Sequence, residues 1–132
     1  MTPRISPERL SAGLAALAEF GGRPDRGVDR LAGSDADLAA RRWLAERMTG
    51  GGLVAGLDGV NNVFGHPPSS GPWLLLGSHS DTVPAGGRLD GAYGVISALE
   101  VSQTLREAAH PAFGRIATIS FHNEEGVVPV GF

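Results

Sequence analysis

Five side chains that can bind a metal or move a proton lie in three short segments of the chain. His79 and Asp81 stand in the first segment, Asp90 in the second, and Glu124 and Glu125 in the third. Four carboxylates brought close together repel one another strongly unless a cation or bound protons neutralise them. Imidazole and carboxylate ligands without sulfur suit Zn²⁺, Mn²⁺ or Co²⁺ better than Ca²⁺, which prefers oxygen alone. The residue types therefore predict a divalent metal site, provided that the fold brings the three segments together.

Composition limits the kind of protein that could hold such a site. The chain has 132 residues, no cysteine and a formal net charge of -3, so it is one small domain without disulfides or thiolate ligands. Its eleven positive residues are all arginine and are scattered, which argues against a nucleic-acid surface. No apolar run is long enough to span a bilayer, and the first residues lack the apolar core of a signal peptide. We therefore expect a cytoplasmic protein with no nucleic-acid or membrane partner.

The first half of the chain predicts two helices and a hairpin. Ser6 followed by Pro7 is typical of a helix start, and this helix should continue to Phe20. Ser34 should cap a second helix, from Asp35 to about residue 48, which the following glycines end. Short strands at 53–55 and 62–64 flank a turn-prone Asp-Gly pair and predict a β-hairpin.

The second half predicts a βαβ unit, which would bring the polar segments together. The apolar run 73–76 is typical of a strand covered on both faces, a helix should run from near Asp90 to His110, and 115–121 should be a second strand. A right-handed crossover makes the two strands parallel, so their carboxyl ends meet at one sheet edge, where open α/β sheets bind ligands. His66 and His110 are expected at the surface in loops at the opposite edge.

Each polar residue also has an ordinary structural explanation. His79 alone could be a hydrogen-bonded loop residue, Asp90 a helix N-cap, and Glu124 and Glu125 solvated charges at a strand end. Taken singly these explanations are favoured, but the shared sheet edge favours a metal site for the group. Asp81, two residues after His79, could accept the ring N–H that the metal does not use and so fix the tautomer.

Three motifs in order resemble a known enzyme family. Segments 76–83, 86–95 and 123–126 are similar to the di-zinc aminoacylase and carboxypeptidase-like metallopeptidase family. The likeness is to the branch that contains N-carbamoyl-L-amino-acid hydrolases, β-ureidopropionases and allantoate amidohydrolases. Weaker similarity at 30–37 and 58–65 extends it over nearly the whole chain. The resemblance implies an α/β fold, part of a three-layer phosphorylase/hydrolase-like zinc-peptidase domain with N-terminal helices, a hairpin and a βαβ unit with parallel strands.

The resemblance also implies a role for each polar residue. His79 would bind one divalent ion, Asp90 would bridge two, and Glu125 would bind the other, while Asp81 orients His79. Glu124 would act as the general base that takes a proton from the attacking water and hands it to the leaving nitrogen. The implied cofactors are two divalent ions, Zn²⁺ or alternatively Mn²⁺ or Co²⁺. The implied reaction is hydrolysis of a linear C–N bond in a small ureido or amide substrate, such as an N-carbamoyl-L-amino acid or allantoate.

The number of ligands leads to a further expectation about the chain as a whole. Two ions that share one bridge need about five protein donors, but the chain offers three at this edge. The resemblance implies that family members are much longer, with two later histidines and a lid domain that forms a homodimer. Where the family has an arginine-containing segment after Gly126, the chain reads Val127–Phe132.

Residues 1–132 are therefore expected to be the N-terminal part of the catalytic metal-binding domain, without the lid and the C-terminal half, and inactive alone. Two alternatives stay open. One is a dipeptidase or N-acyl-amino-acid deacylase of the same superfamily, and the other is a non-catalytic remnant or interaction module.

Overall fold

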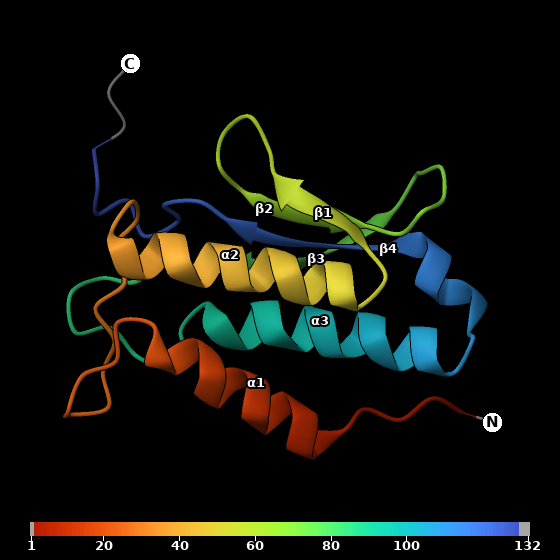
Figure 1. The fold of residues 1–132 in the computed structure, drawn as a ribbon, viewed down its shortest axis with the longest axis horizontal. Helices are drawn as coiled ribbons and strands as arrows, with labels where there is room; N and C mark the ends of the chain where they lie inside the picture. The colour runs from red at the N-terminus through yellow and green to blue at the C-terminus, as the bar shows by residue number, and fades with distance from the viewer. Residues whose placement is uncertain (1, 130–132) are drawn as a thin grey trace.

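The computed structural model describes residues 2–129 and contains three α-helices, one 3₁₀ helix and four strands (Figure 1). In chain order these are α1 (Pro7–Glu19), α2 (Asp35–Gly50), β1 (Val54–Leu57), β2 (Val63–His66), β3 (Leu74–His79), α3 (Ala92–Glu107), η1 (Pro111–Arg115) and β4 (Ile116–Phe121). Val130–Phe132, the end of the segment that departs from the family motif, lie outside the described residues. No helix within 2–129 combines the length and hydropathy needed to cross a membrane.

The first two helices begin where their capping residues predict. The Ser6 hydroxyl accepts a hydrogen bond from the Arg9 backbone N–H, and the Ser34 hydroxyl accepts one from that of Asp37. Each cap satisfies an N–H group that the first helical turn leaves without a partner. Local sequence signals therefore set these two boundaries.

The four strands form one mixed sheet in the order β1-β2-β4-β3. β1 and β2 form the predicted antiparallel hairpin, and β2 also pairs antiparallel with β4. β3 and β4 are parallel, with Leu74 opposite Ile116 at one end and His79 opposite Phe121 at the other. The predicted α/β fold with a βαβ unit is confirmed, and the carboxyl ends of β3 and β4 share one edge.

The helices cover one face of this sheet. α2 packs on β1 and β2, α3 packs on β3 and β4, and α1 lies outside α3 (Figure 1). Gly65 of β2 shows how close this packing is, because a Cβ atom there would lie 2.9 Å from the sulfur of Met48. The core between the layers is formed by side chains from all three helices and from the sheet, namely Leu17, Ala40, Leu44, Met48, Leu53, Val63, Ala92, Val95, Ile96 and Leu99.

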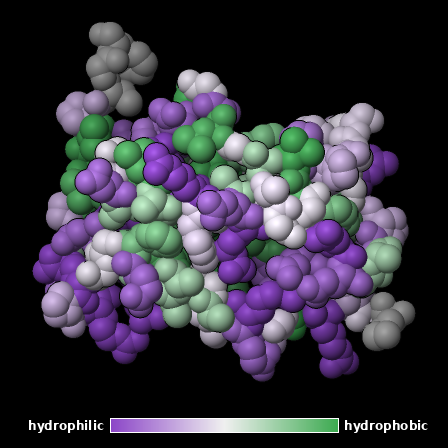
Figure 2. All heavy atoms as spheres, viewed as in Figure 1, coloured by the Kyte–Doolittle hydropathy of each residue, from purple (hydrophilic) through white to green (hydrophobic). Residues whose placement is uncertain are grey.

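The opposite sheet face has no helix over it within residues 2–129, and this corrects one prediction. Leu74 and Leu75 are 64% and 44% exposed, so β3 is not covered on both faces as its apolar run suggested. β3 is the edge strand of the sheet, and its first two side chains, which point to opposite faces, are both exposed there. In Figure 2, apolar side chains gather where β1 and β2 lie in Figure 1, in agreement with the exposed Val54 and Leu57.

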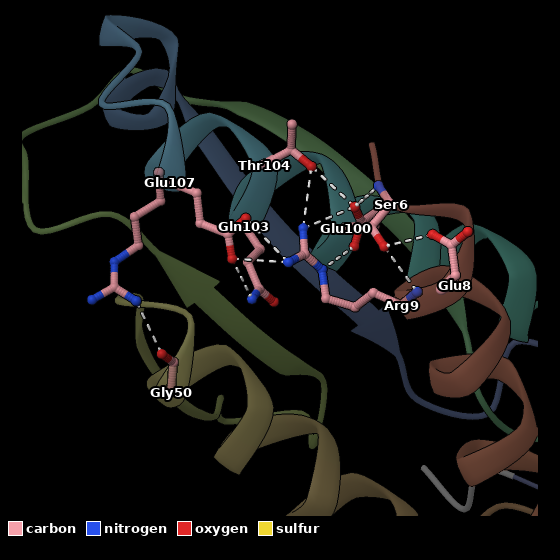
Figure 3. A network of polar contacts seen from close by, with 9 residues as sticks. Ser6, Glu8, Arg9, Gly50, Glu100, Gln103, Thr104 and Glu107 are labelled. Carbon is pink, nitrogen blue, oxygen red and sulfur yellow. Dashed lines mark hydrogen bonds and ion pairs between the residues drawn. The ribbon is translucent and has the colours of Figure 1, made fainter. Parts of the chain in front are cut away.

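A partly buried ion pair attaches α1 to α3 (Figure 3). Arg9 donates from Nε to Glu100 Oε2 at 2.6 Å and from Nη2 to Glu100 Oε1 at 3.0 Å. The Ser6 backbone N–H and the Thr104 hydroxyl also donate to Glu100, and Glu107 accepts a further bond from Arg9 at 2.8 Å. Both oxygens of the buried Glu100 carboxylate therefore accept hydrogen bonds, as a charge removed from water requires.

Two histidines lie outside the predicted site and make contacts with neighbouring residues. His66 does not lie in a loop as expected, because it ends β2 and stacks on Trp73 with ring centroids 4.6 Å apart. His110 lies at the exposed start of η1, where its ring accepts a hydrogen bond from the Ala112 backbone N–H.

Candidate metal centre

The carboxyl ends of β3 and β4 bring the five predicted side chains together. His79 is the last residue of β3, and Glu124 and Glu125 lie in the turn that follows β4. His79 Nε2 lies 3.4 Å from Glu124 Oε2 and 3.7 Å from Asp90 Oδ1. One ligand atom from each of His79, Glu124 and Glu125 falls within 4.8 Å of the others. Residues that are up to 46 positions apart in sequence thus face one small volume.

The hydrogen bond of the buried His79 ring determines which nitrogen faces that volume. Nδ1 lies 2.9 Å from the backbone carbonyl oxygen of Asp81. A carbonyl oxygen only accepts, so Nδ1 carries a proton, and Nε2 is the ring nitrogen that faces Glu124 and Asp90. A ring nitrogen that faces two carboxylates is stabilised by a positive charge between them, which a proton or a metal ion supplies. Neutral imidazole nitrogen with carboxylate oxygen is a donor set that fits a divalent transition metal.

The carboxylate of Asp81 has a different partner from the one that its spacing suggested. Its Oδ1 lies 3.6 Å from His79 Nδ1, and the ring N–H points to the carbonyl of the same residue instead. The two carboxylate oxygens accept the backbone N–H groups of Glu124, at 3.2 Å, and Glu125, at 3.1 Å. Asp81 is 2% exposed. A single buried residue therefore orients His79 through its main chain and holds the Glu124–Glu125 turn through its side chain.

Glycine at position 91 allows the start of α3 to approach the His79 ring. Gly91 has φ +69°, a conformation that side chains rarely adopt, and an added Cβ would lie 2.5 Å from His79 Cε1. Gly91 is the N-cap residue and α3 has no side-chain cap. The interpretation of Asp90 as an N-cap is therefore wrong, and its carboxylate, 63% exposed, is free to face His79.

The carboxylates act on one another as well as on His79. Loss of water contact and the negative charges of Asp90 and Glu124 raise the pKa of Glu125, whereas His79 lowers it. Charge repulsion among carboxylates at a sheet edge is the condition that a bound cation relieves. The electrostatics of the site thus agree with the geometry.

His122 follows β4 directly but does not join this group. Its backbone N–H donates to Asn62 Oδ1 at 2.8 Å, which connects the end of β4 to the hairpin. Within residues 2–129, the clustered metal-binding atoms come from His79, Glu124 and Glu125, with Asp90 beside them.

Comparison with known proteins places this geometry in a family. The sequence model of peptidase family M28 matches residues 61–129, just over half of the chain and the part that contains all five side chains. The chain belongs to peptidase family M28.

The chain is similar to enzymes whose names describe amidohydrolases. It is 36% identical over 128 residues to N-carbamoyl-L-amino-acid amidohydrolase of Pseudomonas sp. (strain NS671), covering 95% of this chain and 31% of that protein. It is 35% identical over 113 residues to allantoate amidohydrolase of Bacillus subtilis (strain 168), covering 83% of this chain and 27% of the relative. The predicted resemblance to the carbamoylase and allantoate amidohydrolase branch is confirmed.

A solved structure shows the same fold. The crystal structure of a hydantoinase/carbamoylase family amidase from Burkholderia phymatum superposes with a TM-score of 0.87 at 48% identity. The match covers 96% of this M28 chain and 31% of the amidase. The chain therefore spans about a third of the length of the relatives that it matches.

Proposed function

We propose that the chain forms one side of the metal centre of an amidohydrolase that cleaves linear C–N bonds outside peptides. The observation that carries this proposal is the His79 ring, whose Nδ1 donates to the Asp81 carbonyl so that Nε2 faces two carboxylates. Similarity to an N-carbamoyl-L-amino-acid amidohydrolase and an allantoate amidohydrolase supports the reaction class.

In the proposed reaction, three residues bind the metal ions and a fourth acts as the general base. His79, Asp90 and Glu125 would hold the divalent ions, which would polarise the scissile carbonyl and make water more acidic. Glu124, whose side chain is 53% exposed beside the ligands, takes the proton from the attacking water. It then returns that proton to the leaving nitrogen. From an N-carbamoyl-L-amino acid the products are the amino acid, CO₂ and ammonia.

Three ligands from this chain are too few for two ions. A pair of ions sharing one bridging carboxylate takes about five protein donors. We propose that the other donors come from polypeptide that corresponds to the remaining two thirds of the relatives. Zn²⁺ is the proposed metal, with Mn²⁺ or Co²⁺ as alternatives, and a homodimer formed through a lid domain stays a prediction.

The substrate is proposed to be an N-carbamoyl-L-amino acid or an allantoate-type ureido compound, as the names of the relatives suggest. A dipeptidase is the second candidate, because the family whose sequence model matches is a peptidase family. Release of ammonia from an N-carbamoyl-L-amino acid or from allantoate, compared with cleavage of dipeptides, separates the two candidates.

A segment exchange tests the catalytic proposal directly. Residues 2–129 replace the matching segment of the Burkholderia phymatum amidase, which is 48% identical and has the same fold. The chimaera should hydrolyse the substrate of its parent, and Glu124→Gln in the chimaera should abolish turnover while the metal content is unchanged. A folded, metal-loaded chimaera without activity contradicts the proposed site. Retained activity in the Glu124→Gln chimaera removes Glu124 as the base.

A further inference from the structure

A segment far from the site in sequence lies along the loop that leads away from β3. The Thr82 backbone N–H donates to the Arg30 carbonyl at 2.8 Å, and the Thr82 hydroxyl accepts from the Arg30 N–H at 2.9 Å. Val28 and Gly86 exchange two backbone hydrogen bonds, each 2.9 Å long. The Asp29 carboxylate extends the contact by accepting a hydrogen bond from the Ala85 backbone N–H at 2.6 Å. The loop between β3 and Asp90 is thus held by residues 28–30 over most of its length.

Arg30 lies at the centre of this contact and is completely buried. Its Nε donates to the Ser80 carbonyl at 2.6 Å, and its Nη1 donates to the carbonyls of Leu17, at 2.8 Å, and Phe20, at 2.7 Å. The last carbonyls of a helix lack partners within the helix, and a cation is favourable there. One planar guanidinium therefore connects the end of α1 to the residue between His79 and Asp81.

The charge of Arg30 is maintained despite burial. Removal from water lowers the pKa of the guanidinium to about 10, and the negative charges of Asp37 and Asp81 oppose that change. Arg30 is thus a cation at neutral pH and contributes a positive charge behind the carboxylate of Asp81.

The position of Ser80 connects this cation to the metal centre. The Ser80 carbonyl belongs to the peptide group that leads into Asp81, the residue whose own carbonyl holds His79 Nδ1. The Ser80 hydroxyl also contacts the hydroxyl of Ser120 on β4 at 3.1 Å. We propose that Arg30 is a positioning residue of the metal centre, which fixes the 79–81 backbone so that the His79 ring keeps Nε2 directed at the carboxylates. The inference rests on the proposed function, in which this site binds a metal.

Comparison of Arg30→Met with Arg9→Met tests the proposal. Both variants lose an arginine that attaches α1, but the side-chain hydrogen bonds of Arg9 go to Glu100 and Glu107 on α3 instead of the 80–86 loop. The first measurement is the tautomer of His79 in the metal-free chain near pH 8, from the ¹⁵N shifts of the imidazole. The second is the Zn²⁺ dissociation constant, from calorimetry, of the Burkholderia phymatum amidase chimaera that carries the same substitutions.

In the wild-type chain and in Arg9→Met, His79 should carry its proton on Nδ1. Arg30→Met should shift the ring toward a mixture of both tautomers and weaken Zn²⁺ binding by about 10- to 100-fold, the usual effect of losing a group that orients a ligand. Arg30→Lys should give a partial loss, because an ammonium cannot reproduce the planar set of donors that spans these carbonyls.

A folded Arg30→Met chain with the wild-type tautomer and Zn²⁺ affinity overturns the proposal. If Arg30→Met does not fold, Arg30→Lys decides, and wild-type values for both measurements in that variant overturn it equally. A chimaera with the wild-type segment that binds no Zn²⁺ contradicts the proposed metal centre instead. The tautomer comparison requires no metal, so it still decides the role of Arg30.

Discussion

Replacing Asp81 with asparagine separates the two tasks of this residue. The backbone carbonyl that holds His79 is unchanged in Asp81→Asn, whereas the carboxylate that accepts the N–H groups of Glu124 and Glu125 becomes an amide. An amide has one acceptor oxygen and one NH₂ donor. One of the two N–H groups therefore loses its acceptor and faces another donor.

The expected loss of stability in the Glu124–Glu125 turn follows from these two hydrogen bonds. A hydrogen bond to a charged group contributes about 1.5 to 3 kcal/mol, and the surviving bond becomes a weaker neutral one. We expect the Glu124–Glu125 turn to be destabilised by about 3 kcal/mol, which corresponds to about 100-fold faster hydrogen exchange if the turn opens locally.

Amide hydrogen exchange of Glu124 and Glu125 measures this effect, and Asp58→Asn is the matched control. Asp58 also accepts two backbone N–H groups in a turn, from Val60 and Asn62, but it is exposed and accepts both on one oxygen. Its replacement should change stability by no more than about 0.5 kcal/mol. Exchange rates at Glu124 and Glu125 that are the same in Asp81→Asn as in the wild type would refute the assignment of the carboxylate to the turn.

Three further predictions concern other parts of the chain. Gly91→Ala should destabilise the fold by about 2 kcal/mol or more and displace His79, since it combines a positive φ with steric overlap. Gly33→Ala, at φ +81° with open space around it, should show the conformational cost alone in denaturant unfolding, and equal losses would contradict the contact with His79. Burial raises the pKa of Glu100, but hydrogen bonds, first among them that of Arg9, outweigh it and hold this pKa below its ordinary value. The stability gained from the ionised carboxylate is present above the unfolded-state pKa and lost as the pH falls through the folded one. The advantage of wild type over Glu100→Gln in urea unfolding should therefore shrink from pH 7 to about pH 3, and a constant difference would contradict the ion pair. Calorimetric titration of the 132-residue chain with Zn²⁺ should give at best weak, incomplete binding, and two tightly bound ions per chain would contradict the ligand count.

The elements of the fold could be predicted from the sequence because their signals are local. Ser6 and Ser34 identify two helix starts, and the change from helical to strand patterning after α2 identifies the hairpin. The exposure of Leu74 and Leu75 could not be predicted in this way. Burial of an apolar strand depends on what packs on each face and on whether the strand lies at a sheet edge, and neither is encoded within the strand itself.

The grouping of the candidate side chains at one sheet edge could be predicted, but their hydrogen bonds could not. Topology alone places segments that follow parallel strands at one edge, and this brings His79 and Glu125 together. The bonds from Glu124 and Glu125 to Asp81 span more than forty residues of sequence, and no spacing rule points to them. The same holds for Arg30, whose motif was visible in the sequence although its partners were not.

The parallel register of β3 and β4 has a practical consequence for engineering. The pairing of His79 with Phe121 fixes the distance between the two segments that carry the candidate ligands. This distance does not depend on the length of the connection between the strands. That connection turns back at the exposed residues 108–110, which lie at the other end of the sheet from the ligands. Exposed turns of this kind tolerate insertions, whereas one added residue between Phe121 and Glu124 would shift the ligands relative to β3. The 108–110 turn is therefore the place where a reporter peptide can be inserted while the proposed metal centre keeps its geometry.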